Sequence, residues 1–159
     1  MWIWSRIQQA KCKDWLSRHG FLAKSKAAWQ PSDQTGLLGE EIAAAHLESL
    51  GYRVVARNFK RTWGEIDLIA IEDETVVYVE VKTRFSRTAR PELAVTAAKR
   101  KQLIRLAQSF AAQHGLLHQA SRFDIVAVNA PQSVDPIVKH FKNAFRATSN
   151  QQAFTRFHQ

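Results

Sequence analysis

The amino-acid sequence predicts an α/β or α+β domain in which a mixed β-sheet has a helix on each side. The main observation is the order of hydrophobic patterns: a helical segment, three strand-like segments, a second helical segment and one or two further strands. The composition agrees, because 159 residues with 45% hydrophobic and 23% charged side chains are typical of a globular domain with a substantial core. No apolar run approaches the roughly 20 residues that a membrane-spanning helix needs.

The first half of the chain predicts a helix followed by three strands. The helix is expected to begin at residue 35 or 36, to run to about Leu50 and to stop at Gly51. Strands rich in Val, Ile and Tyr are expected at 52–59, 65–71 and 76–82. Residues 72–75, with the sequence EDET, are polar and predict a hairpin turn between the second and third strands.

The second half predicts one long helix and one or two strands. Leucine, alanine and phenylalanine side chains at helical spacing favour a helix over 96–114, stopped by Gly115. A fourth strand is expected at 122–128 and a short fifth at 137–141. Residues 1–34 are expected to form a basic, Trp-rich N-terminal extension and linker, residues 35–148 the folded domain, and residues 149–159 a flexible tail.

The start of the chain and its cysteine content predict where the protein is located, and its net charge predicts an anionic partner. The start of the chain lacks the continuous apolar stretch of a signal peptide, and the single Cys12 excludes an internal disulfide and a Cys-cluster zinc site, so we expect a cytoplasmic protein. The net charge of +9 predicts binding to nucleic acid or to a lipid surface. The segment from residue 81 to residue 105 contains eight Lys and Arg residues and only one acidic residue, Glu92. Runs of like charge are also common on solvated surfaces.

Three charged residues in the predicted hairpin form the candidate site. Strand side chains alternate between faces, so Glu80 and Lys82 share a face with Val76 and Tyr78. A tight turn at 72–75 sets residues whose numbers sum to about 147 opposite one another, so that Asp67 faces Glu80. By the same register Glu65 faces Lys82.

Two carboxylates held close together repel unless a positive charge lies between them. That charge is either the amine of Lys82 or a bound hard cation such as Mg²⁺, which prefers oxygen ligands and often uses only one or two carboxylates. A cation, carboxylates and a lysine that orients or deprotonates the attacking water together suit phosphodiester hydrolysis.

Two helical residues extend this group. Glu40 has Leu37, Ala43, Ala44 and Leu47 on its own face of the first predicted helix, so it is expected to point towards the sheet. Lys99 continues the apolar stripe of the second long helix and could reach the sheet end or a phosphate. The alternative is structural: Glu80 and Lys82 form a surface ion pair, Glu40 is a helix-start acid and Lys99 extends to solvent.

Five segments together resemble the YraN-like family of bacterial proteins, over about residues 35–145: GLLGEEIAAAHLESLGY, WGEIDLIA, VVYVEVKTR, AAKRKQLIRLA and RFDIVAV. That family is similar in turn to archaeal Holliday junction resolvases and to the PD-(D/E)xK nuclease superfamily. The resemblance implies a restriction-endonuclease-like core, in which residues 35–148 are a nuclease-like domain. It implies that Asp67 and Glu80 bind the divalent metal, Mg²⁺ or Mn²⁺, that Lys82 is the catalytic lysine and that Glu40 is the helix acid at the metal site. Glu65 departs from the superfamily pattern, since it stands where a proline often precedes the aspartate.

Three hypotheses about function follow. The leading one is a Mg²⁺-dependent endodeoxyribonuclease that hydrolyses DNA, with branched, Holliday-junction-like substrates and a two-fold dimer implied by the resemblance; its contacts to the nucleic-acid backbone would come from Arg84, Arg87, Lys99 and Lys101. The alternative is a nucleic-acid-binding protein of the same fold without catalysis. A third hypothesis, compatible with either, is contact of the Trp-rich N-terminus with a membrane surface or a protein partner, against packing of these tryptophans on the domain.

Overall fold

Two helices and five strands make up the part of the chain that the computed structural model describes, residues 34–83, 95–129 and 135–147. The elements are α2 (Gln34–Ser49), β1 (Arg53–Arg61), β2 (Gly64–Glu72), β3 (Thr75–Thr83), α3 (Ala97–Gln113), β4 (Ser121–Asn129) and β5 (Ile137–Phe145). The predicted N-terminal extension up to residue 33, residues 84–94 of the basic segment between residues 81 and 105, and the predicted C-terminal tail lie outside these ranges.

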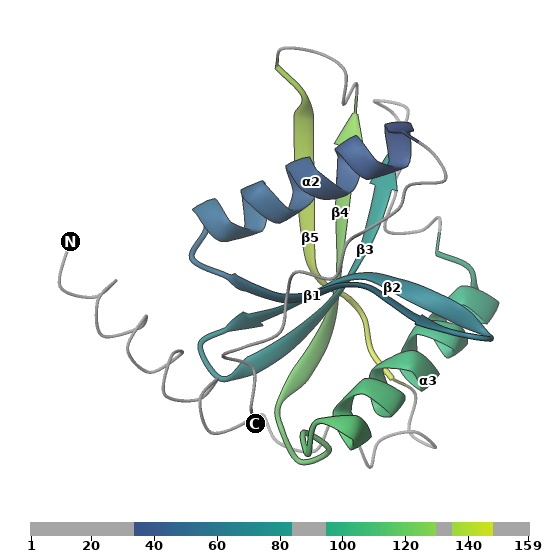
Figure 1. Ribbon diagram of the computed structural model, residues 1–159. Helices are drawn as coiled ribbons and strands as arrows, with labels where there is room; N and C mark the ends of the chain where they lie inside the picture. Colours follow the sequence, from purple (N-terminus) through teal and green to yellow (C-terminus); the bar gives the residue numbers. More distant parts are fainter. Residues whose placement is uncertain (1–33, 84–94, 130–134, 148–159) are drawn as a thin grey trace, which may run out of the picture.

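The five strands form one mixed sheet in the order β1-β2-β3-β4-β5. Every neighbouring pair is antiparallel except β3 and β4, which are parallel. A parallel pair needs a crossover connection, and α3 lies within that connection. Helix α3 covers one face of the sheet and α2 lies across the other (Figure 1). The predicted α/β architecture, a mixed sheet flanked by helices, is therefore confirmed.

The predicted hairpin between β2 and β3 is also confirmed, together with its register. Glu72 pairs with Thr75 around a turn in which Asp73 has a φ of 53°, in the left-handed region that Asp tolerates better than most residues. Pairing continues to Leu68 and Val79, so opposed residue numbers sum to 147 as predicted. The ladder ends there, and the predicted pairs Asp67–Glu80 and Glu65–Lys82 lie beyond its end.

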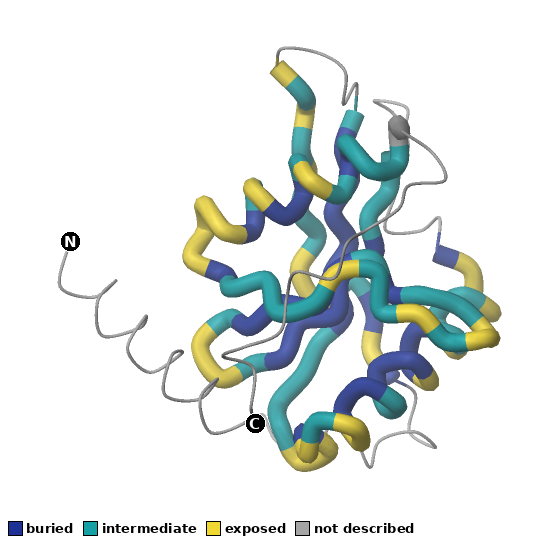
Figure 2. Tube along the Cα trace, in the orientation of Figure 1, coloured by how far each residue is buried: buried dark blue, intermediate teal, exposed yellow. Residues whose placement is uncertain are grey.

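Each face of the sheet has its own hydrophobic core. Val77 and Val79 of β3 pack on the α2 face with Ala43, Ala44 and Leu47 of that helix. Val76 and Tyr78 pack on the α3 face, so the predicted alternation along β3 is correct. Figure 2 shows the buried residues running along the middle of the sheet and along the inner sides of both helices.

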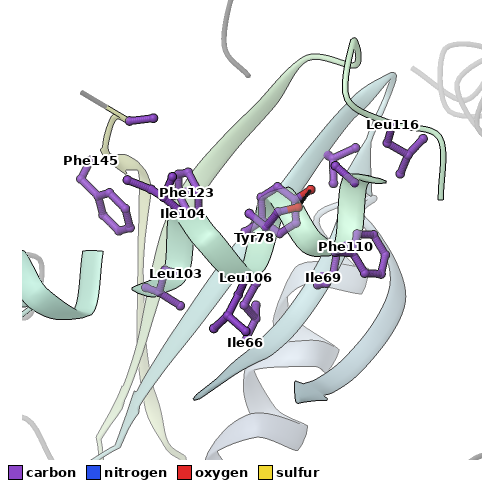
Figure 3. Packing of buried hydrophobic residues seen from close by; sticks show 14 of the residues in the cluster. Ile66, Ile69, Tyr78, Leu103, Ile104, Leu106, Phe110, Leu116, Phe123 and Phe145 are labelled. Atoms are coloured by element: carbon purple, nitrogen blue, oxygen red, sulfur yellow. Dashed lines mark hydrogen bonds between the residues drawn. The ribbon is translucent and has the colours of Figure 1, made fainter. Parts of the chain in front are cut away.

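The core beneath α3 combines aliphatic side chains with the aromatic rings of Tyr78, Phe110, Phe123 and Phe145 (Figure 3). The ring of Tyr78 stacks on Phe123 with centroids 5.4 Å apart, and its hydroxyl donates a 3.3 Å hydrogen bond to the carbonyl of Ala107. The predicted stripe of α3 is buried in full: Leu103, Leu106, Ala107, Phe110 and Ala111. The helix is capped by the Thr96 hydroxyl, and Gly115 beyond its end has a φ of 68°.

The fifth strand differs from the prediction. It continues to Phe145 instead of ending at Phe141. Its last residues include Lys142 and Asn143, which are exposed on this edge strand, and Asn143 has a φ of 52°. Polar residues are not typical of strands, so the sequence does not predict that the strand continues past Phe141. In the structure, pairing of Phe145 with Phe123 continues the sheet. Neither described helix is both long and apolar enough to cross a membrane.

Candidate active site

The backbone pairing of β2 with β3 ends just before Asp67. Beyond that point the Asp67 carboxylate, in place of a β2 carbonyl, accepts a hydrogen bond from the backbone of β3. The N–H of Val76 donates towards β4, to the carbonyl of Ala120, so the N–H of Val81, five residues later, faces β2. No β2 carbonyl continues the ladder there, and Asp67 Oδ2 accepts this hydrogen bond at 2.6 Å. The opening between the two strands thus positions the first candidate residue.

Glu80 lies at the same end of the sheet, buried between two ammonium groups. Glu80 is 4% exposed. Its Oε1 accepts a 2.8 Å hydrogen bond from Lys82 Nζ, and its Oε2 lies 3.2 Å from Lys99 Nζ. The contact with Lys99 is an ion pair and not a hydrogen bond, and Oε2 is a buried oxygen with no hydrogen-bond partner among the described residues. A buried carboxylate oxygen in this condition is suited to a further positive ligand.

Glu40 reaches the site from α2, on a helix that approaches β3 closely. A Cβ atom at Gly39 would overlap the side chain of Thr83, so glycine permits this approach at the end of β3. The carboxylate of the adjacent Glu40 accepts a 2.9 Å hydrogen bond from Asn58 Nδ2 of β1. Sequence reasoning did not identify Asn58; its signal was an asparagine within a segment otherwise typical of a strand.

Electrostatics couple Asp67 to the other two acids. Burial raises the pKa of Asp67, the neighbouring charge of Glu80 and the charge of Glu40 raise it further, and the Val81 hydrogen bond only partly opposes them, so that the pKa is about 7. Burial likewise raises the pKa of Glu40, against the hydrogen bond from Asn58. Carboxylates with perturbed pKa values cluster at functional sites, where burial and neighbouring charges adapt them to ligand binding or proton transfer.

We predict that the pKa of Asp67 in the metal-free protein, followed by ¹³C NMR of its carboxyl group, is about 7 and falls in Glu80→Gln. The variant removes a repelling negative charge. A carboxyl whose pKa is raised by folding from 3.8 favours the folded state below that value and loses this contribution as the pH rises through about 7. An Asp67 titration that is the same in wild type and variant would show that the two groups do not interact.

The donor set fits a hard divalent cation in part. Asp67 and Glu80 offer carboxylate oxygens at one end of the sheet, and Glu80 Oε2, which accepts no hydrogen bond from the described residues, could bind a cation in place of its ion pair with Lys99. No three His, Cys, Asp or Glu side chains within the described ranges are grouped so that they could hold a metal ion by themselves. A Mg²⁺ or Mn²⁺ ion would therefore need water and substrate phosphate as further ligands, which is usual for Mg²⁺.

The predicted nucleic-acid contacts divide into three cases. Arg84 and Arg87 lie outside the described residues. Lys99 is in the first turn of α3 with its amine on Glu80, so it belongs to the carboxylate site. Lys101 is exposed on α3, two residues from Lys99, where it can meet a solvent-side ligand.

A second polar cluster, around Asp124 of β4, is built differently. The Asp124 side chain is fully buried and is bonded to Arg122 Nε at 3.0 Å, to His140 Nε2 at 2.9 Å and to the N–H of Asn143 at 2.9 Å. Burial by itself would raise the pKa of Asp124, but these three hydrogen bonds hold it below its ordinary value. Both Asp124 oxygens accept hydrogen bonds, so this cluster is structural, whereas Glu80 Oε2 accepts no hydrogen bond from the described residues.

Comparison with known proteins shows that the chain is similar to the members of one bacterial protein family. The profile of the uncharacterised protein family UPF0102 matches residues 39–128, which confirms the YraN-like resemblance. A UPF0102 protein of Geobacter sulfurreducens is 42% identical over 113 residues, 69% of this chain and 87% of the relative. UPF0102 proteins of Moorella thermoacetica (44% identity, 58% of this chain and 78% of the relative) and Renibacterium salmoninarum (42%, 69% and 93%) are similar to the chain as well.

Proposed function

The chain belongs to the uncharacterised protein family UPF0102, and we propose that it is a metal-dependent nuclease that hydrolyses phosphodiester bonds of DNA. The observation that carries this proposal is the buried Glu80 carboxylate, which lies between Lys82 and Lys99 at the point where β2 and β3 open. One of its oxygens, Oε2, forms an ion pair with Lys99 but accepts no hydrogen bond from the described residues. Its support from the sequence is the Asp67, Glu80 and Lys82 pattern, which resembles the PD-(D/E)xK nucleases and their restriction-endonuclease-like core.

In this proposal each residue has a physical role. Asp67 and Glu80 hold Mg²⁺ or Mn²⁺, and Glu40 adds negative charge next to Asp67. The bound cation supplies electrostatic stabilisation of the charge that develops on the phosphate. The Lys82 amine, 2.8 Å from Glu80, is placed to donate a hydrogen bond to a phosphate oxygen or to the attacking water. Hydrolysis forms a bond between phosphorus and the water oxygen and breaks the ester bond to the leaving sugar oxygen, which takes up a proton.

The basic surface supplies affinity for the backbone. The net charge of +9 and the exposed Lys101 of α3 favour a polyanionic substrate, and contacts to phosphates carry no base specificity. Arg84 and Arg87 would extend these contacts along the same segment. The resolvase-like pattern favours branched DNA and a two-fold dimer, because paired cuts across a junction need two sites.

A nucleic-acid-binding protein without catalysis is the second candidate. It is favoured by the ion pairs that Lys82 and Lys99 already make with Glu80, and by the finding that no three potential ligands in the described ranges form a ready-made metal site. In that case the two lysines alone offset the buried carboxylate.

The experiment that separates the candidates is incubation of wild-type protein with labelled forks, flaps, four-way junctions, duplexes and single strands, in Mg²⁺, in Mn²⁺ and with a chelator. The nuclease proposal predicts metal-dependent cleavage, strongest on branched DNA. Binding to these DNAs without cleavage of any of them in either metal would favour the second candidate.

A further inference from the structure

Asn58 has an unusual backbone conformation in the middle of β1. Its φ is 50°, in the left-handed region that side chains other than glycine seldom adopt and that asparagine tolerates best. Its neighbours Arg57 and Phe59 pair with Leu68 and Ile66 of β2, so Asn58 stands opposite Asp67. Such conformations persist only where the surrounding structure requires them, and they are frequent at functional sites.

The conformation coincides with a change of face in both strands. Regular alternation would put residues three apart on opposite faces of a sheet. Yet Ala56 and Phe59 of β1 both pack on the α3 face, and so do Ile66 and Ile69 of β2. The reversal lies between these pairs, at Asn58 and the facing Asp67.

The reversal leaves the Asn58 side chain free to reach the α2 side of the sheet. There its Nδ2 donates the 2.9 Å hydrogen bond to Glu40 Oε2, joining residues 18 positions apart in the chain. Asn58 therefore connects the helix that carries Glu40 to the strand pair that carries Asp67. A neutral amide suits this task, because it fixes one carboxylate oxygen without neutralising the charge.

We propose that Asn58 is a positioning residue of the candidate metal site, whose amide holds the Glu40 carboxylate so that its negative charge favours cation binding at Asp67 and Glu80. This inference rests on the proposed function. The inference extends the proposed function because it assigns a role to a residue outside the acid and lysine pattern. It also explains why β1 is distorted opposite Asp67. The competing explanation is that Asn58 only accommodates the left-handed backbone.

The substitution Asn58→Gly separates the two explanations. Glycine adopts a positive φ without steric cost, so the backbone is retained and only the amide is lost. The matched control is Asn143→Gly in β5, which makes the same change at a φ of 52° and away from Glu40. The probe is Mn²⁺, titrated by calorimetry into the full-length protein, with the thermal midpoint of each variant recorded.

We expect Asn58→Gly to bind Mn²⁺ about 10- to 100-fold more weakly than wild type, as is typical when a group that orients a ligand is removed. Asn143→Gly should bind as wild type does. In a Glu40→Gln background, Asn58→Gly should cause no further loss, because the carboxylate that it orients is already gone.

Equal Mn²⁺ affinity of wild type and Asn58→Gly would overturn the inference and leave the proposed function intact. A loss that persists undiminished in the Glu40→Gln background would also overturn it, since the effect would then not pass through Glu40. Wild-type protein that takes up no Mn²⁺ would overturn the inference together with the proposed metal dependence.

Discussion

Glu80→Gln is expected to reduce metal-dependent DNA cleavage by at least ~10³-fold, because the loss of a charged cation ligand removes several kcal/mol of transition-state stabilisation and each ~1.4 kcal/mol is a factor of ten. Glutamine retains the shape of the side chain and can accept the hydrogen bond from Lys82, so the fold should be retained. Binding to DNA should persist, because removal of a negative charge between Lys82 and Lys99 does not weaken attraction to phosphate.

The matched control is Glu72→Gln, the same change at the far end of β2. Glu72 forms ion pairs with Arg122 and Lys142 and has no contact with the Glu80 site. Its cleavage rate should equal that of wild type when both are assayed below their unfolding temperatures. Cleavage by Glu80→Gln within tenfold of the wild-type rate would mean that Glu80 does not hold the cation.

Asp124→Ala is expected to lower the free energy of unfolding by about 3–5 kcal/mol, the usual cost of removing one partner from a buried ion pair. The substitution removes one of the two carboxylates that pair with Arg122, whose side chain is 17% exposed, and it leaves the N–H of Asn143 without an acceptor. It also removes the side-chain links between β4 and β5 at the place where their register shifts. Urea unfolding at neutral pH measures the difference.

The pH dependence of this effect has a definite sign. The pKa of Asp124 is lower in the folded protein than its ordinary value, so its stabilising contribution is present above the unfolded pKa and is lost as the pH falls through the folded pKa. The free energies of unfolding of wild type and Asp124→Ala should therefore converge in acid.

Lys142→Ala, which removes an ion pair on a 52% exposed lysine, should lower the free energy of unfolding by less than ~1 kcal/mol. An Asp124→Ala protein as stable as Lys142→Ala would refute the structural role.

The β2–β3 hairpin could be predicted from the sequence because its constraints are local. A polar turn separates two strands rich in Val and Ile, and a slip by one residue would expose the whole apolar set. The same pattern placed Glu80 and Lys82 on one face. It could not show that the ladder stops after Leu68 and Val79, since the stop coincides with the change of face at Asp67 and at Asn58 of β1, which the pattern of these two strands does not contain.

Asn58 and the Asp124 cluster could not be predicted because their partners come from distant parts of the chain. The hydrogen bond between Asn58 and Glu40 depends on the packing of α2 against the sheet and on the change of face in β1. Asp124 within an apolar strand signals a buried acid that needs a partner. Arg122, two residues away, could have been proposed, but His140 and Asn143 meet it only through the pairing of β5, whose length the sequence underestimates.

The most direct test of the central claim is a calorimetric titration of Mn²⁺ into wild-type protein and into Glu80→Gln at the same pH and salt. The claim is that the carboxylates at the open end of β2 and β3 form a cation site. It predicts saturable Mn²⁺ binding by the wild type and its loss in Glu80→Gln, with both proteins folded. Identical titrations of the two proteins, whether both bind Mn²⁺ or neither does, would contradict it.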